Sequence, residues 1–169
     1  MSAPTVLRYA TRVQVFLVRH AEAVHDTLAL PDAHRPLTQH GRRQVRALGD
    51  RLRWHDCVPT HIWSSPRVRA IQTAEVLAAT LRSETAVEVV AALAPDGPAN
   101  EVVAALGELP RDAIVVVIGH EPGLSAIGAL LIGEPALAGI AKAEAVRIVD
   151  GAVRWRFAYD GETPAMAAR

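Results

Sequence analysis

Short runs of apolar and often β-branched residues recur along the chain and predict the strands of a sheet. The predicted strands cover residues 13–18, 60–64, 87–90, 113–118, 145–149 and 152–158. The run at 113–118 is the most apolar, so we place it at the centre of the sheet. Asp150-Gly151, between the last two runs, is a strong signal for a two-residue hairpin turn.

Between these runs, apolar residues return with the spacing of amphipathic helices. Thr38 is a typical N-cap for the first helix, and Pro66 is tolerated at the first position of the second. The predicted helices cover residues 38–53, 65–81, 100–109 and 123–132. Strands that alternate with helices and end in a hairpin indicate an α/β fold, a three-layer α/β/α sandwich with a mostly parallel central sheet and a C-terminal β-hairpin.

Length and composition set limits on the kind of protein. The chain has 169 residues, which is the size of one domain, so we expect a single domain over residues 1–169 with a core at about 13–158. Half of the residues are hydrophobic, which excludes a disordered chain. Lys and Arg total 18, as do Asp and Glu, so no general affinity for nucleic acid or an anionic membrane is expected.

The same composition suggests a location. No apolar run reaches the roughly 18 residues that a membrane span needs, and residues 1–12 lack the apolar core of a signal peptide. The one cysteine, Cys57, cannot form an internal disulfide, which fits a reducing compartment. We therefore expect a cytoplasmic protein.

Cationic and potentially cationic residues lie at one end of three of the predicted elements. Arg19 and His20 end the first strand, Arg69 lies in the first turn of the second helix, and His120 follows the run at 113–118. The carboxyl ends of parallel strands meet at one edge of a sheet, where ligands bind. With no obvious carboxylate between them, these groups would repel one another in an empty site. A ligand with two or more negative charges explains them best, and phosphate fits.

These residue types also suggest a reaction. A neutral imidazole is a good nucleophile toward phosphorus, and nearby arginines are expected to lower the pKa of His20 and keep it neutral. The same arginines would stabilise the charge of the transition state. We find no metal-ligand spacing in the sequence, so neither a metal nor another cofactor is expected.

Four segments resemble, in order and spacing, the motifs of the histidine phosphatase superfamily, also called the phosphoglycerate mutase-like fold. They are Leu17-Val18-Arg19-His20-Ala21-Glu22-Ala23, then Arg35-Pro36-Leu37-Thr38 with Gly41, then residues 64–74 with Arg69-Ala70 before Gln72-Thr73, and Val117-Ile118-Gly119-His120. Each motif is weak by itself, but four in register make a strong resemblance.

The resemblance implies a role for each matching residue. His20 would be the phosphorylated nucleophile, and Arg19, Arg69 and His120 would hold the phosphoryl oxygens. Arg67 would be a surface or rim residue. Arg35 is a candidate for a further phosphate contact, with a place at the start of the helix or on the surface as the alternative.

The chain is closest in pattern to the small phosphohistidine phosphatases, because it is short and has no large insertion between Arg19-His20 and Arg35. An open site of this kind suits phosphohistidine in a protein. The alternatives are a small phosphomonoester, phosphoryl transfer within a sugar phosphate as in the mutases, and an inactive phosphate-binding regulatory module.

The general acid is the least defined part of the resemblance. Glu121 follows His120, where the acid phosphatases carry a carboxylate, and is the first candidate. Asp96 lies near the position where the mutases carry their general acid and is the second candidate. Glu22 is the third, with a structural or rim role as the alternative. An imidazole leaves more easily than an alkoxide, so an ill-defined acid favours cleavage of P–N bonds over P–O bonds.

Overall fold

The computed structural model describes residues 13–159 and 164–166, and these contain a seven-stranded sheet with the order β3-β2-β4-β1-β5-β6-β7. The strands are β1 (Gln14–Arg19), β2 (His61–Ser64), β3 (Val87–Val89), β4 (Ile114–Gly119), β5 (Ala145–Val149), β6 (Ala152–Tyr159) and β7 (Pro164–Met166). The first four strands run parallel to one another, and β5, β6 and β7 follow antiparallel.

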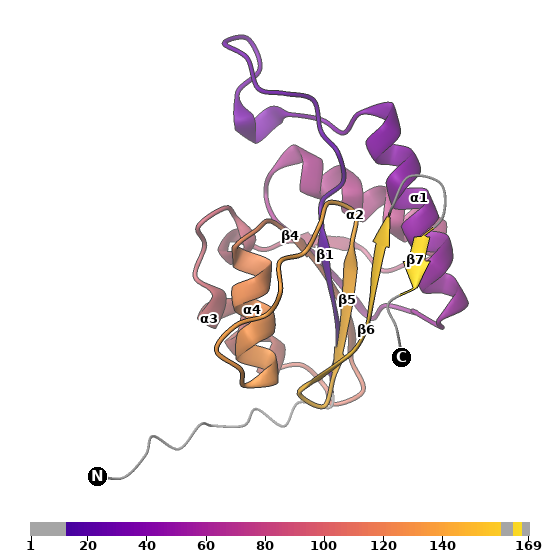
Figure 1. Cartoon of the computed structure of the whole chain (residues 1–169), viewed down its shortest axis with the longest axis vertical. Coiled ribbons are helices and arrows are strands. Elements are labelled where there is room, and N and C mark those ends of the chain that lie inside the picture. The colour runs from indigo at the N-terminus through magenta and orange to yellow at the C-terminus, as the bar shows by residue number, and fades with distance from the viewer. Residues whose placement is uncertain (1–12, 160–163, 167–169) are drawn as a thin grey trace.

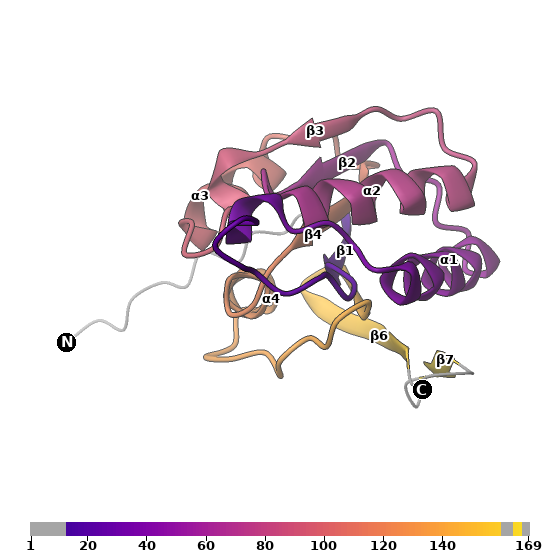
Figure 2. The ribbon, with the colours of Figure 1, turned by 90° about the horizontal axis from the view of Figure 1, so that it is seen from above.

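Helices cover both faces of this sheet (Figures 1 and 2). They are α1 (Gln39–Trp54), α2 (Val68–Leu81), α3 (Ala99–Gly107) and α4 (Gly123–Ile132), with short 3-10 turns η1 (Asp32–His34) and η2 (Ala91–Leu93). Helices α1 and α2 pack together on one face, and α3 and α4 on the other. The predicted α/β/α sandwich is therefore confirmed.

The alternation of side chains along β1 explains how two cores form. Phe16 and Val18 join the core under α1 and α2, whereas Val15 and Leu17 join the core under α3 and α4. Neighbouring residues of a strand point to opposite faces, so a strand covered on both sides must be apolar throughout. This explains why the sequence pattern identifies β1 and β4 so clearly.

Three details of the predicted elements differ from the structure. The middle strand of the seven is β1, and the 113–118 run forms its neighbour β4, which is still paired on both sides. Helix α2 begins at Val68, because Arg67 keeps an extended backbone as its N-cap, with φ −69° and ψ 137°. Strand β7 has no counterpart among the predicted strands, since its three residues are too few to show a strand pattern.

The predicted hairpin is confirmed. Asp150 and Gly151 join β5 to β6 with φ of 51° and 70°, the left-handed pair that a two-residue turn requires. Cys57 is buried, and this burial raises the pKa of its thiol to about 12. Among the described residues, none of the helices combines the length and apolar character needed to cross a membrane.

Candidate active site

His20 lies immediately beyond the carboxyl end of β1, and its neutral form has a defined tautomer. Its Nδ1 lies 2.8 Å from the carbonyl oxygen of Ala21, which can only accept, so Nδ1 carries the proton and donates. The lone pair therefore resides on Nε2. Nε of Arg69 donates to this nitrogen over 3.3 Å.

The surroundings keep His20 neutral. The pKa of His20 is lowered to about 4, mainly by burial and also by the charges of Arg69, Arg19 and Lys142, while the hydrogen bond to Ala21 acts to raise it. The expected direction is thus found, but burial is the main cause, ahead of the arginines. At neutral pH the ring is uncharged and Nε2 is available as a nucleophile.

Arg69 and His120 join His20, as the motif pattern predicts. All three residues are nearly buried: the exposed fraction is 5% for Arg69, 6% for His20 and 7% for His120. The centroids of the two imidazole rings are 5.0 Å apart. Arg69 comes from the first turn of α2 and His120 from the end of β4, the strand beside β1. Residues separated by a hundred positions of sequence therefore meet at one edge of the sheet.

Arg19 is anchored beside this group. Its Nη1 donates to the carbonyl oxygen of Ile140 over 3.1 Å, while its Nε is buried without a hydrogen-bond partner. Burial of an arginine nitrogen without an acceptor is costly, so an anion that accepts from it would be favoured.

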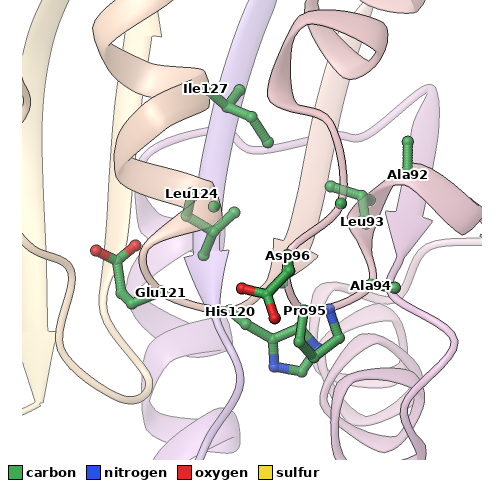
Figure 3. Close-up of a pocket in the computed structure, with 12 residues that line it drawn as sticks. Ala92, Leu93, Ala94, Pro95, Asp96, His120, Glu121, Leu124 and Ile127 are labelled. Carbon is green, nitrogen blue, oxygen red and sulfur yellow. The ribbon is translucent and has the colours of Figure 1, made fainter.

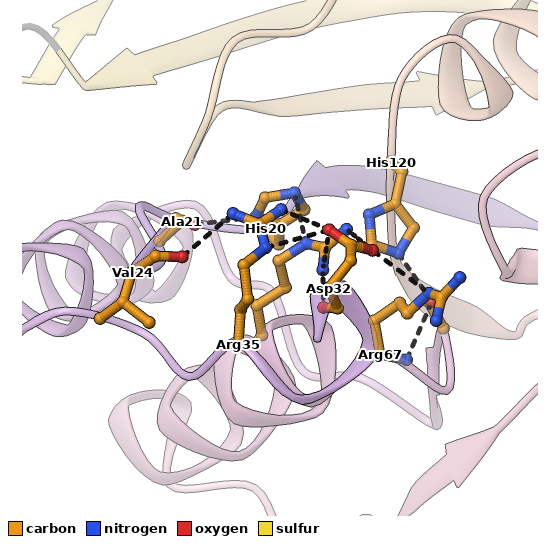
Figure 4. Close-up of polar contacts among 9 residues, drawn as sticks. His20, Ala21, Val24, Asp32, Arg35, Arg67 and His120 are labelled. Carbon is orange, nitrogen blue, oxygen red and sulfur yellow. Dashed lines mark hydrogen bonds and ion pairs between the residues drawn. The ribbon is translucent and has the colours of Figure 1, made fainter. Parts of the chain in front are cut away.

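His120 has a partner that the sequence pattern does not identify. Its Nε2 lies 2.7 Å from Oγ of Ser65, which is fully buried, while its Nδ1 is buried without a partner. Figure 4 shows the unpartnered nitrogen on the side of the ring that faces Asp32 and His20. If the hydroxyl of Ser65 donates to Nε2, the proton of the neutral ring stays on Nδ1, where a phosphoryl oxygen can accept it. Burial, and then the charges of His20, Arg69 and Arg67, lower the pKa of His120 to about 3, while Asp32 acts to raise it.

The expectation that no carboxylate lies among the arginines is wrong. Asp32, in η1, accepts from Nε and Nη2 of Arg35 at 3.0 and 2.8 Å and from Nη2 of Arg69 at 3.4 Å. Nε of Arg67 lies 3.8 Å from its Oδ2 (Figure 4). The loop before α1 has no apolar period, so its sequence gives no sign that Asp32 turns toward the arginines.

Contacts with Asp32 determine where two other arginines lie. Arg35 donates to Asp32 and to the carbonyl oxygen of Val24, so it braces the loop, and its hydrogen bonds among the described residues go to these two partners. Arg67 pairs with Asp32, and its charge lowers the pKa of His120. It therefore lies at the rim, as expected, but faces the site.

The two carboxylates proposed as general acid have different surroundings. Glu121 accepts from the backbone N and from Oγ of Ser125, so its carboxylate caps the first turn of α4. In Figure 3 it points away from His120. Asp96, Glu121 and His120 line the same pocket, so the pocket itself does not separate the two acids. They differ in that the carboxylate of Glu121, which the sequence pattern places first, is already engaged by Ser125.

A second set of motif residues fastens the loop after His20 to the helices. Glu22 accepts from Oγ1 of the N-cap Thr38, and a Cβ on Gly41 would lie 2.1 Å from the carbonyl oxygen of Glu22. Only glycine permits this approach of α1. Thr73 accepts from the backbone N of Ala21 and donates to the carbonyl oxygen of Arg69. The motifs therefore fix the backbone directly after His20, and Glu22 has a structural role, which was the alternative to its role as general acid.

Within the described part of the chain, no group of three or more His, Cys, Asp or Glu side chains is arranged to hold a metal ion. The side-chain cations that act on His20 and His120 in this part of the chain include Arg19, Arg67, Arg69 and Lys142.

Comparison with known proteins agrees with this geometry. Residues 15–94 match the sequence profile of the histidine phosphatase superfamily (branch 1). An uncharacterized protein of Picosynechococcus sp. is 30% identical over 113 residues, which cover 66% of this chain and 68% of that protein.

Two solved structures are similar over most of the chain. The protein histidine phosphatase SixA complexed with tungstate superposes with a TM-score of 0.79 at 28% identity, covering 85% of this chain and 95% of that chain. A protein of Nakamurella multipartitia assigned as a phosphohistidine phosphatase SixA gives a TM-score of 0.63 at 26% identity, covering 83% and 86%. The chain therefore belongs to the histidine phosphatase superfamily and is a phosphatase of its SixA-like branch.

Proposed function

We propose that this phosphatase removes the phosphoryl group from phosphohistidine in proteins, through a phosphorylated intermediate on its own His20. The observation that carries the proposal is the pairing of Nδ1 of His20 with the carbonyl oxygen of Ala21. This pairing leaves the lone pair on Nε2, the nitrogen beside Arg69.

The reaction would proceed in two displacements. In the first, the lone pair of Nε2 forms a bond to phosphorus, and the bond to the leaving group breaks with its electron pair. The positive charge that develops on the ring of His20 is stabilised by the carbonyl oxygen of Ala21. In the second, water attacks phosphorus, the P–Nε2 bond breaks, and its electron pair returns to His20.

In this proposal, three side chains would stabilise the phosphoryl oxygens during both steps. Arg69 already contacts Nε2 of His20, and Arg19 and His120 each carry a buried nitrogen without a partner. Fixed donors directed at developing charge are the main source of catalysis in phosphoryl transfer.

A protein substrate is supported by the surroundings of the site and by the similarity to SixA. The loop between His20 and η1 is exposed over residues 25–29. Within the described residues, only this loop and η1 lie between His20 and α1, and no long insertion there encloses a small sugar phosphate. SixA, whose tungstate complex superposes on this chain, is itself a protein histidine phosphatase.

The test is a substrate panel with a phosphohistidine peptide, a phosphoserine peptide, an aryl phosphate and a sugar phosphate, assayed with a chelator present. We expect the phosphohistidine peptide to give the highest kcat/KM, and His20 to carry an acid-labile phosphoryl group during turnover. His20→Ala should abolish both. His61→Ala is the matched control, because His61 is the first residue of β2 and so lies at the amino end of the strands, opposite the site.

Each other outcome has a clear meaning. Hydrolysis that survives His20→Ala would contradict the covalent mechanism. Loss of activity with the chelator would contradict a mechanism that needs no metal. Binding of tungstate without turnover of any substrate would favour the phosphate-binding regulatory module.

A second function, hydrolysis of a small phosphomonoester, is favoured by one observation. Asp96 lines the pocket beside His120, where a carboxylic acid could protonate an ester oxygen. A sugar phosphate hydrolysed faster than the phosphohistidine peptide would decide for this function.

A further inference from the structure

Asp32 is an acidic residue among cations, and the two displacements described for His20 assign it no role. Besides the bonds of its carboxylate to Arg35 and Arg69, its backbone carbonyl oxygen accepts from Nη1 of Arg69 over 2.9 Å. It therefore holds the same guanidinium whose Nε reaches His20. The carboxylate of Asp32 is thus linked to the nucleophile through one side chain.

The carboxylate also keeps a free side. The side chain of Asp32 is 45% exposed, in contrast to the nearly buried Arg69 and the two histidines. Its Oδ1 accepts both short bonds from Arg35, while Oδ2 has only the long contacts at 3.4 Å to Arg69 and 3.8 Å to Arg67. A carboxylate has about four acceptor positions, so Oδ2 can accept from a group that enters the site.

The charge of Asp32 determines what it can do there. Burial acts to raise the pKa of Asp32, but hydrogen bonds and charges from Arg35 and Arg69 outweigh it and hold the pKa below its ordinary value. The group is ionised at neutral pH, so it accepts hydrogen bonds and has no proton to give. A general acid for an alkoxide is therefore excluded, whereas a partner for an N–H group is not.

An anionic group at the mouth discriminates among leaving groups. A phosphohistidine ring that is protonated on its second nitrogen is a cation with one N–H group, and this is the form that can leave as neutral imidazole. A phosphoserine or sugar phosphate has no such N–H at that position. A carboxylate stabilises a histidine cation by accepting from its N–H, as in Asp–His pairs of other enzymes.

We propose that Asp32 selects the leaving group, by accepting a hydrogen bond from the free ring N–H of the phosphohistidine substrate. This inference rests on the proposed function and assigns a specificity-determining residue to it. As Nε2 of His20 bonds to phosphorus, the P–N bond of the substrate breaks and its electron pair stays on the substrate ring. The ring leaves as neutral imidazole with its proton on the other nitrogen, held by Asp32. No proton has to come from the enzyme, so the step balances without a general acid.

The first test compares Asp32→Asn with the unaltered protein on two substrates. We expect kcat/KM for the phosphohistidine peptide to fall at least about tenfold further than kcat/KM for an aryl phosphate. A role confined to positioning Arg69 would lower both by the same factor, and this result would overturn the inference. Asp26→Asn is the matched control, because Asp26 is an exposed acid of the same loop and the substitution removes the same charge.

The second test alters the substrate, so it holds even where Asp32→Asn fails to fold. N-phosphoimidazole is compared with its analogue methylated on the other ring nitrogen, which keeps the positive charge but has no N–H. Relative to uncatalysed hydrolysis, we expect the unaltered protein to accelerate the first compound at least about tenfold more. Equal acceleration of the two would overturn the inference.

These outcomes are distinct from a failure of the proposed function. If the unaltered protein does not hydrolyse phosphohistidine or N-phosphoimidazole, the proposed function fails and the inference fails with it. If it does, but Asp32→Asn lowers all substrates equally, only the inference about Asp32 fails.

Discussion

Nε of Arg69 donates a hydrogen bond to Nε2 of His20 across 3.3 Å, although the two residues are 49 positions apart in the sequence. The contact directs one guanidinium N–H at the atom that would bond to phosphorus. A phosphoryl group on Nε2 would bring its oxygens to this N–H without a large movement of Arg69. In the proposed mechanism, this donor is therefore already in place before any substrate binds, which is how preorganised donors accelerate a reaction.

Replacement of Arg69 by lysine tests this arrangement. Lysine keeps the charge but presents a single ammonium group, which cannot contact His20 and Asp32 together as the guanidinium does. We expect Arg69→Lys to lower kcat/KM about 100-fold, measured with an aryl phosphate. Arg43→Lys, at an exposed position of α1, is the matched control and should have no comparable effect. Near-normal activity of Arg69→Lys would mean that charge alone is sufficient.

The low pKa of His20 predicts an unusual pH profile. In the proposed mechanism the neutral ring of His20 is the nucleophile, and burial together with nearby cations lowers the pKa of His20 to about 4. Lowering a histidine pKa extends the range of the neutral form downward, so protonation of His20 should not reduce kcat/KM between pH 5 and 7, around the ordinary value of about 6.5. We expect the loss of activity to occur nearer pH 4, measured with a substrate whose own titration is known. A fall centred near 6.5 would show that the ring is not shielded in solution.

The sequence predicts which residues meet at the site better than how they are held. Arg19, His20 and His120 follow strands with continuous apolar runs, and parallel strands bring their carboxyl ends together whatever the loops do. The pattern of strands and helices is therefore sufficient to place them at one edge. Arg69 can be placed in the same way, from the helix that follows β2.

Asp32 and Ser65 cannot be placed with the same ease. Asp32 lies in an irregular segment, where no period indicates the direction of a side chain, and the neutral sum of charges does not show which charges pair. For Ser65, the sequence indicates only a position at the start of a helix. Its position directly after β2, at the same edge as His20 and His120, is the signal that could have identified it.

Ser65 gives a prediction about the tautomer of His120. Ser65→Ala removes the hydroxyl 2.7 Å from Nε2, so the proton of the neutral ring is no longer held on Nδ1. We expect the inhibition constant for tungstate to rise about tenfold, because a donor to the oxyanion is weakened. Ser64→Ala is a matched control, since Ser64 is also fully buried but donates to the carbonyl oxygen of Ser65. Equal inhibition constants for Ser65→Ala and the unaltered protein would contradict a role for this pair.

Asp96 and Glu121 are separated by a comparison of leaving groups. We expect Asp96→Asn to lower kcat/KM for a phosphoserine peptide at least about tenfold further than for nitrophenyl phosphate. The serine alkoxide needs a proton to leave, whereas the nitrophenolate does not. Glu121→Gln should alter the ratio of the two substrates less than about threefold, since its carboxylate is engaged by Ser125. The reverse result would restore Glu121 as the general acid.

Gly41 is where the fold depends most directly on the absence of a side chain. A Cβ at this position would lie 2.1 Å from the carbonyl oxygen of Glu22, and the contact is with backbone on both sides, so no side chain can move to relieve it. We expect Gly41→Ala to lower the free energy of unfolding by about 2 kcal/mol or more, measured by urea denaturation.

Gly123 provides the control for that experiment. It begins α4, and a Cβ there would meet nothing within 4 Å. Gly123→Ala should therefore leave the free energy of unfolding unchanged or raise it by up to about 1 kcal/mol, because alanine favours the helix. Because Gly41 lies against Glu22, two residues after His20, its substitution should also displace the nucleophile and lower kcat/KM under conditions where the protein remains folded. Stability and activity of Gly41→Ala equal to those of the unaltered protein would show that α1 can withdraw from this loop without cost.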